Sequence, residues 1–366
     1  MTRIGITGGE GFLGWHLRAY LRAEPDFEVV SAGRELFGDA ARLRAFVGAV
    51  DAVVHLAGRN RGEEREVRDT NIALAEQLAS ACAAAGAPPH VVYANSTHAT
   101  RATLYGESKR IAAEVLGEYG RRAHAPFTNL VFPHLFGEGG RPFYNSAVAT
   151  FCHQLAQGDE PQVIEDVELE LVHAQRAAAE ITTALREKRD GEARIRGTSI
   201  RVSAVLAKLE AIAHQYRGRL IPELASEFEL DLFNCYRSYL FPAHYPVDLD
   251  LREDARGTLF EAVQTLRGGQ CFLSTTRPGK TRGNHYHRRK LERFLVLHGE
   301  AVIRVRRLVA GAVAEFRVSG ARPQYVDMPT LHTHNITNSG TDDLITLFWS
   351  QEIFDAAHPD TYTEPV

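Results

Sequence analysis

The stretch Ile4-Gly5-Ile6-Thr7-Gly8-Gly9-Glu10-Gly11-Phe12-Leu13-Gly14 decides the fold of the first half of the chain. A short apolar run leads into glycines spaced three apart, and residues without Cβ allow both a tight turn and the close approach of a pyrophosphate. The phosphates would lie at the N-terminus of the next helix, where unpaired N–H groups attract negative charge. The alternative is an ordinary glycine-rich turn. The stretch predicts a dinucleotide site formed by Thr7, Gly8, Gly11, Phe12, Leu13 and Gly14.

Strands and helices alternate outward from this stretch. Short apolar runs bounded by turns predict buried parallel strands, and Ala/Leu-rich stretches of helical period predict helices between them. The predicted strands are Ile4–Thr7, Glu28–Ser31, Ala52–Ala57 and His90–Asn95. The predicted helices are Phe12–Ala23, Asp39–Val47 and Asn71–Ala85. The alternation predicts an α/β Rossmann domain.

The end of the second strand bears on the choice of cofactor. It reads Val29-Val30-Ser31-Ala32-Gly33-Arg34, with no acidic residue at its tip to bind the ribose hydroxyls of NAD. An arginine can instead pair with the 2′-phosphate of NADP. The sequence therefore favours NADPH with Arg34 as the discriminating residue, and the alternative is an arginine in a solvated loop.

A tyrosine and a lysine lie four residues apart in Tyr105-Gly106-Glu107-Ser108-Lys109, on one face of a predicted helix. An ammonium beside a phenol lowers a pKa that starts near 10, so Tyr105 is expected to exchange a proton with a substrate oxygen. Ser96, directly after an apolar run, offers a hydroxyl to the same oxygen.

These motifs, in this order and with the strand His55-Leu56-Ala57-Gly58 between them, resemble an extended short-chain dehydrogenase/reductase. The resemblance implies that Ser96 and Tyr105 contact the substrate oxygen and that Lys109 holds the nicotinamide ribose. It also implies cofactor contacts at Leu56, Ala57, Gly58, Tyr105 and Lys109. The sequence departs from the family at Asn95, where a serine is usual, and the hydroxyl role then lies with Ser96 or Thr97.

The hydrophobic pattern of the sequence changes after residue 246, where helical periods give way to short strands separated by glycine turns. We place the domain boundary there, with a reductase domain at 1–246 and an all-β domain at 247–366. The predicted strands of the second domain are Phe294–Leu297, Ala301–Arg306, Gln324–Met328 and Leu344–Trp349.

Three imidazoles and a carboxylate recur in the β domain at the spacing of metal ligands. His285 and His287 are two apart, so both point to one face of a strand, and Glu292 and His334 complete the set. These ligands suit Zn(II), Mn(II), Fe(II) or Ni(II), with Zn(II) the simplest choice where no redox chemistry is needed. The alternative is a group of structural histidines in a barrel core.

The spacings Gly-x5-His-x-His-x4-Glu-x6-Gly and Pro-x4-His-x3-Asn resemble the two motifs of a cupin, a double-stranded β-helix barrel. Leu331 stands where the second motif usually has glycine, so the turn before His334 is expected to be distorted. His332 competes with His334 for the ligand position. Four residues are candidates for a general base: Glu261, Lys280, Tyr325 and His332.

The chain carries 42 Lys+Arg against 46 Asp+Glu, a net charge of −4 that argues against nucleic acid as a partner. No apolar stretch is long enough for a membrane span or a signal peptide. Cys82, Cys152, Cys235 and Cys271 form no CxxC pair, which favours free thiols in a reducing cytoplasm.

Both halves together resemble the CapF-type bifunctional enzymes of capsular polysaccharide synthesis. The resemblance includes Phe143–Cys152, Gly283-Asn284-His285 and Pro359-Asp360-Thr361-Tyr362. It implies that the cupin epimerises C3 of a UDP-4-keto-6-deoxy-N-acetylhexosamine and that the Rossmann domain then reduces C4 with NADPH to a talose-like product.

Two alternatives stay open beside the bifunctional enzyme. One is a nucleotide-sugar 4-ketoreductase whose cupin is structural or dimerising, and the other is a redox-responsive sugar-binding regulator. We also expect a homodimer through residues 247–366, with Tyr245–Leu251 and Leu344–Trp349 supplying the sheet edge. The exact sugar stays open.

Overall fold

A computed structural model describes residues 1–249, 252–254, 257–259, 263–265, 269–309, 311–352 and 355–366. Within these ranges, the side chains of residues 34, 252–254, 257–259, 264–265 and 270 are not described. Contacts divide the chain into two compact units. Unit 1 comprises Met1–Phe136 and Glu168–Ile200, and unit 2 comprises Gly137–Val167 and Arg201–Val366. Within the described ranges, no helix has both the length and the apolar character that crossing a bilayer requires.

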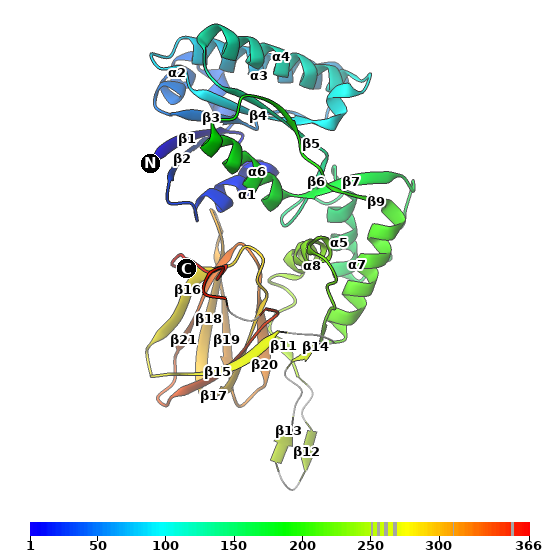
Figure 1. The fold of residues 1–366 in the computed structure, drawn as a ribbon. Helices are drawn as coiled ribbons and strands as arrows, with labels where there is room; N and C mark the ends of the chain where they lie inside the picture. Colours follow the sequence, from blue (N-terminus) through cyan, green and yellow to red (C-terminus); the bar gives the residue numbers. More distant parts are fainter. Residues whose placement is uncertain (250–251, 255–256, 260–262, 266–268, 310, 353–354) are drawn as a thin grey trace. The chain divides into compact units, whose positions relative to one another are not determined.

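A six-stranded parallel sheet forms the centre of unit 1, in the order β2-β1-β3-β4-β5-β8 (Figure 1). Its strands are β1 (Thr2–Thr7), β2 (Phe27–Ala32), β3 (Ala52–His55), β4 (His90–Ser96), β5 (Phe127–Phe132) and β8 (Gly191–Arg194). The central strands are short apolar runs buried on both faces, which is why they form a parallel sheet covered by helices. The Rossmann prediction is confirmed.

Helices cover both faces of this sheet (Figure 1). They are α1 (Phe12–Leu21), α2 (Ala40–Gly48), α3 (Glu64–Ala83), α4 (Leu104–Ala123) and α6 (Ala174–Glu187). Alternate strand residues point to opposite faces, so Ile4 and Ile6 pack with α1 and α6 whereas Val53 and Val91 pack with α2, α3 and α4. The helix predicted from Asn71 begins seven residues earlier, because the Glu63 side chain caps it by accepting from the Glu66 amide.

Three short strands form a separate sheet in the order β6-β7-β9. They are β6 (His134–Phe136), β7 (Glu168–His173) and β9 (Thr198–Arg201), and β6 pairs with β7 in parallel. Two short 3₁₀ helices, η1 (Arg34–Gly38) and η2 (Thr97–Thr100), follow β2 and β4. Both lie at the carboxyl ends of the parallel strands, where ligands bind in folds of this type.

Two five-stranded antiparallel sheets form the β part of unit 2 (Figure 1). The first, in order, is β11 (Val247–Asp248), β20 (Gln324–Met328), β17 (Glu292–His298), β22 (Leu344–Ser350) and β15 (Gln270–Thr276). The second is β19 (Val313–Ser319), β18 (Glu300–Arg307), β21 (His332–Asn338), β16 (Thr281–Tyr286) and β23 (Tyr362–Thr363). Their apolar side chains share one core, so the architecture is the predicted cupin-like barrel.

Two pairs of shorter strands complete unit 2: β12 (Arg252–Asp254) with β13 (Gly257–Leu259), and β10 (Leu220–Ile221) with β14 (Gln264–Thr265). The strand expected to supply a dimer edge, β22, lies between β17 and β15 and has both edges paired. The expectation of a free edge at Leu344–Trp349 is therefore wrong, because this strand is hydrogen-bonded to β15 on one side and to β17 on the other. The homodimer itself stays a prediction.

Three helices that precede residue 246 belong by their contacts to unit 2: α5 (Ala147–Gln157), α7 (Val202–Arg217) and α8 (Glu227–Leu240). Tyr216 of α7 donates to Asp327 of β20, and the Tyr216 and Tyr245 hydroxyls lie 2.7 Å apart. The compact units therefore do not coincide with a division at 246, which stays a prediction about the two sequence modules.

Candidate active sites

The glycine turn lies at the point in unit 1 where the strand order reverses. β1 has β2 on one side and β3 on the other, so the carboxyl ends of β1 and β3 lie side by side, with Thr7 opposite His55. This reversal is where open α/β sheets bind their ligands. The structure thus brings Thr7 and Gly8 of the turn against Leu56 and Ala57, and Gly58 follows next to Asn71.

At two positions in the turn, neighbouring backbone lies so close that only glycine fits. Gly8 has φ +74°, and a Cβ there would lie 2.7 Å from the Ala57 amide nitrogen. A Cβ on Gly14 would overlap the Gly8 carbonyl oxygen and the Gly9 backbone. Gly11 precedes α1 and offers no side chain to cap it, so the first N–H groups of the helix stay available to an anion. The turn fits a dinucleotide pyrophosphate.

The tip of β2 carries a carboxylate, contrary to the sequence expectation. Glu35 accepts a hydrogen bond from the Gly33 amide at 3.2 Å, so its side chain folds back onto the end of the strand. The side chain of Arg34 lies outside the described residues. An acidic group at this position is the usual partner of the ribose hydroxyls of NAD. Glu35 directly follows Arg34, so this acidic group lies one residue beyond the predicted tip of the strand.

Ser96 and Tyr105 meet at the carboxyl end of β4. Ser96 is the last residue of the strand, and its hydroxyl accepts from the His98 amide at 3.2 Å. Tyr105 lies in the first turn of α4, where Thr103 caps the helix by accepting from the Gly106 amide at 3.0 Å. Burial raises the pKa of Tyr105, and a hydrogen bond with Ser96 opposes that rise. The two hydroxyls therefore lie within hydrogen-bonding reach of each other.

Lys109 lies one turn further along α4 and does not lower the pKa of Tyr105 as the sequence predicted. Its ammonium donates to the Ala94 carbonyl at 2.9 Å and lies 4.7 Å from the centre of the Tyr93 ring. Burial lowers the pKa of Lys109 to about 8. Because the pKa of Tyr105 is raised, the phenol keeps its proton at neutral pH.

Three further residues around this site, Asn71, His98 and His134, were not predicted from the sequence. The buried Asn71 side chain donates to the Arg59 carbonyl at 2.9 Å and to the Ser108 hydroxyl at 3.2 Å, and so ties the loop after β3 to α4. His98 lies edge-on to Tyr105 and to His134, with ring centres 6.1 and 5.3 Å apart. The only signal for them in the sequence was Asn71 itself, a polar residue on the otherwise apolar, buried face of α3.

The four predicted metal ligands come together in unit 2, the one such group among the residues that the structure describes. Their ligand atoms all lie within 4.8 Å of one another. An oxygen of Glu292 lies 2.8 Å from Nε2 of His287, 3.3 Å from Nε2 of His334 and 3.8 Å from Nε2 of His285. The ligands come from β16, β17, β21 and the loop after β16.

The protonation of the group suits a cation. Burial pushes the pKa of Glu292 up, but the three histidine rings beside its carboxylate outweigh that effect and hold the pKa well below its ordinary value. Burial lowers the pKa of His334 to about 4. His287 donates from Nδ1 to the Asp360 carbonyl at 2.6 Å, and its buried Nε2 has no hydrogen-bond donor facing it. A lone pair aimed at a carboxylate is the arrangement of two metal ligands.

The turn before His334 forms in spite of Leu331. This residue adopts φ +59°, the left-handed conformation that glycine takes without cost, and its amide donates to the His287 carbonyl at 2.8 Å. The turn therefore keeps the conformation that glycine would give it, with the backbone strain confined to Leu331. His332 does not replace His334: its Nδ1 bonds to the Thr330 carbonyl and its ring packs 5.1 Å from Phe241.

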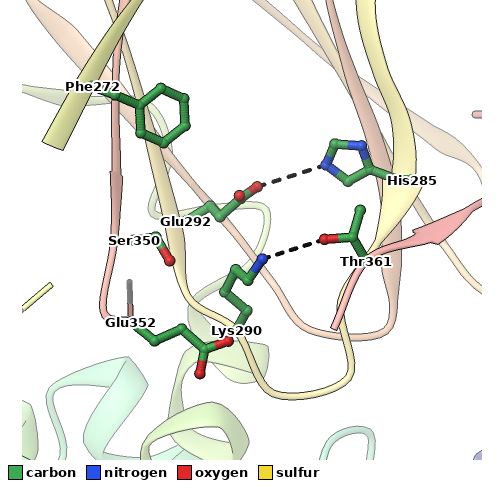
Figure 2. A pocket seen from close by; sticks show the side chains of 7 residues that line it. All are labelled: Phe272, His285, Lys290, Glu292, Ser350, Glu352 and Thr361. Atoms are coloured by element: carbon green, nitrogen blue, oxygen red, sulfur yellow. Dashed lines mark hydrogen bonds and ion pairs between the residues drawn. The ribbon is translucent and has the colours of Figure 1, made fainter. Parts of the chain in front are cut away.

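A cavity of about 250 Å³ opens beside the histidine–glutamate group (Figure 2). Its lining is Phe272, His285, Lys290, Glu292, Ser350, Glu352 and Thr361. Of the predicted general bases, Lys280, Tyr325 and His332 do not line it, and Glu261 lies outside the described residues. Lys290, which is not among the predicted bases, brings an ammonium to the cavity instead.

Comparisons with known proteins match two separate stretches of the chain to two families. Residues 4–196 match the NAD dependent epimerase/dehydratase family, and residues 252–362 match the polysaccharide biosynthesis C-terminal domain.

Similar proteins span the whole chain. Over 365 residues it is 32% identical to a UDP-2-acetamido-2,6-beta-L-arabino-hexul-4-ose reductase of Pseudomonas aeruginosa, covering 98% of each. The crystal structure of the capsular polysaccharide assembling protein CapF from Staphylococcus aureus matches with a TM-score of 0.62 at 32% identity and 100% coverage of both. A dTDP-6-deoxy-L-talose 4-dehydrogenase (NAD(P)(+)) of Kitasatospora kifunensis is 31% identical over 141 residues, covering 33% of this chain and 44% of that protein.

Proposed function

The chain belongs to the NAD dependent epimerase/dehydratase family, in the CapF-type group that adds a polysaccharide biosynthesis C-terminal domain, and we propose that it carries two activities. The barrel epimerises C3 of a UDP-linked 4-keto-6-deoxy-N-acetylhexosamine. The Rossmann domain then reduces the C4 ketone to a talose-like product. The name of the Pseudomonas relative, a reductase of a UDP-linked hexul-4-ose, supports this substrate class.

The reductase step uses the hydroxyls of Ser96 and Tyr105. NADPH, when bound at the glycine turn, supplies the hydride for C4. Tyr105 donates its phenolic proton to the sugar oxygen, and its raised pKa keeps that proton in place until the step occurs. Ser96 orients the same oxygen by hydrogen bonding. Lys109 holds the nicotinamide ribose.

The preference for NADPH over NADH rests on Arg34, and Glu35 opposes it. Replacing each in turn tests the preference. Arg34→Ala should raise the KM for NADPH about tenfold, the loss of one phosphate contact, and leave that for NADH unchanged. Glu35→Ala should affect NADH alone. Equal efficiency of the wild type with both cofactors would contradict the assignment.

The epimerase step begins with transfer of the C3 proton, which the neighbouring ketone acidifies, to a base in the cavity, where Glu352 is the lining carboxylate outside the ligand group. A divalent metal, Zn(II) by the ligand set, would be held by His285, His287, Glu292 and His334 and would supply positive charge near that ketone. Lys290 adds a second positive charge at the edge of the same cavity, and Phe272 supplies an apolar wall for a sugar ring. Return of a proton to the opposite face inverts C3.

One observation carries this proposal: a single chain holds both the Ser96–Tyr105 pair and a ligand group that opens on a cavity. The cavity is smaller than the ~300–1,000 Å³ of typical ligand sites, which suits one sugar ring.

Incubation of the UDP-4-keto sugar in D₂O without NADPH tests the epimerase. Deuterium should enter at C3, as read by NMR, and added NADPH should then be consumed.

A ketoreductase with a structural metal in its barrel is the alternative. Four protein ligands fill a tetrahedral site, as structural zinc sites do, and this observation favours it. In that case NADPH is consumed but no deuterium appears at C3.

A further inference from the structure

The C-terminal segment of the chain carries a buried carboxylate that holds the loop of a metal ligand. Asp360 is 4% exposed and lies about seventy residues after that loop in the sequence. One of its oxygens accepts from the Arg288 amide at 3.1 Å, and the other accepts from the Arg289 and Lys290 amides at 2.9 and 2.8 Å. Three successive N–H groups thus converge on one side chain.

The backbone of the same residue contacts the ligand directly. The Asp360 carbonyl accepts the Nδ1 proton of His287 at 2.6 Å. That bond fixes which nitrogen carries the proton and leaves the Nε2 lone pair toward Glu292. Asp360 has φ +42°, a left-handed conformation that aspartate tolerates better than most residues. Its carboxylate bonds hold the backbone in that conformation.

The residues on either side of Asp360 hold the lysine of the cavity. Lys290 donates from Nζ to the Pro359 carbonyl at 2.8 Å and to the Thr361 hydroxyl at 3.3 Å (Figure 2). Beyond them, β23 pairs with β16, where Thr363 lies opposite His285. One short segment therefore fixes His287, Lys290 and the strand of His285.

We propose that Asp360 is the positioning residue of the metal site, acting through its carbonyl on His287 and through its carboxylate on the loop between His287 and Lys290. The inference rests on the metal centre of the proposed function. A hydrogen bond to the far nitrogen of a ligating histidine orients the ring and raises its basicity, and loss of such a bond weakens metal binding about 10–100-fold.

Titration of the metal-free full-length protein with Co(II), followed by its d–d absorption, tests the role directly. Asp360→Ala should weaken Co(II) binding 10–100-fold and change the band shape, because His287 is no longer held. Asp360→Asn keeps one acceptor oxygen and the tolerance of positive φ, so it should restore most of the affinity.

Asp355→Ala is the matched control. Asp355 is an exposed carboxylate of the same segment, whose contacts are with Ala357 and His358, and its removal should leave Co(II) binding unchanged. If Asp360→Ala fails to fold, Asp360→Asn against wild type still decides, with a smaller loss and an altered spectrum expected. A folded Asp360→Ala protein with wild-type affinity and spectrum would overturn the role of Asp360 alone. A wild type that binds no Co(II) would overturn the metal centre as well.

Discussion

Leu331 and Lys109 each differ from what the sequence motifs predicted, Leu331 in its side chain and Lys109 in its contact. The motif spacing predicted a position for glycine at 331, and the structure keeps the glycine conformation while burying a leucine there. The sequence also predicted that Lys109 faces the phenol of Tyr105, whereas its ammonium bonds to the Ala94 carbonyl. Both differences come from tertiary contacts that spacing does not encode.

Substitutions at Leu331 should reverse the usual order of stability. Both Leu331→Gly and Leu331→Ala lose a buried side chain, at a cost of about 2–5 kcal/mol. Glycine relieves the left-handed strain, so Leu331→Gly should be about 1 kcal/mol more stable than Leu331→Ala in urea unfolding. Leu308, equally buried and without a positive φ, is the control, and there alanine should be the more stable. An alanine advantage at both positions would contradict strain at Leu331.

The reductase should lose efficiency above about pH 8. Lys109 has a pKa lowered to about 8, so its positive charge is present below that pH and is lost above it. Tyr105, with a raised pKa, stays protonated through this range. The kcat/KM for NADPH should therefore fall tenfold per unit above pH 8. Lys109→Arg stays charged and should lack that limb, and a limb that persists in this variant would assign it to another group.

Hydrophobic periodicity predicted strands and metal ligands, but it did not predict the contacts between residues far apart in the sequence. Apolar runs gave β1, β3, β4 and β17 because a buried strand needs little besides such a run. The four ligands followed from alternation along β16 and the two motifs. The contacts of Asn71, Lys290 and Asp360 could not be predicted, because their partners lie 12 to 73 residues away in the sequence.

Removing one ligand should greatly weaken the binding of the metal to the barrel. His285→Ala or Glu292→Ala should contain less than a tenth of the metal of the wild type, which should hold about one equivalent per chain. Added Zn(II) at a hundred times its Kd should stabilise the wild type by about 2.7 kcal/mol and leave both variants unchanged. His358→Ala, an exposed histidine outside the group, should respond as the wild type does. Zn(II) that raises the melting temperature of all four proteins alike would argue against this site.

For the whole molecule, the two units should unfold as separate bodies with α7 belonging to the second. The chain has two tryptophans, Trp15 in unit 1 and Trp349 in unit 2, both buried. Tyr216→Phe removes a hydroxyl from buried Asp327 and should lower the unfolding free energy reported by Trp349 by about 1–3 kcal/mol. Trp15 should not respond.

Tyr119→Phe is the matched control, because its buried hydroxyl donates to the Pro89 carbonyl within unit 1. It should shift the Trp15 transition alone. Trp15→Phe and Trp349→Phe backgrounds separate the two signals. A common shift of both tryptophans with either variant would mean that the chain unfolds as one body.

NMR of the UDP-4-keto sugar in D₂O, with NADPH consumption followed in the same sample, separates the two activities in Tyr105→Phe and Glu292→Ala. Tyr105→Phe should incorporate deuterium at C3 at the wild-type rate and consume NADPH at least a hundredfold more slowly, because the phenolic proton is needed only for the hydride step. Glu292→Ala should show no exchange at C3. Loss of both activities in folded Tyr105→Phe, or unchanged exchange in Glu292→Ala, would contradict the division of chemistry between the two sites.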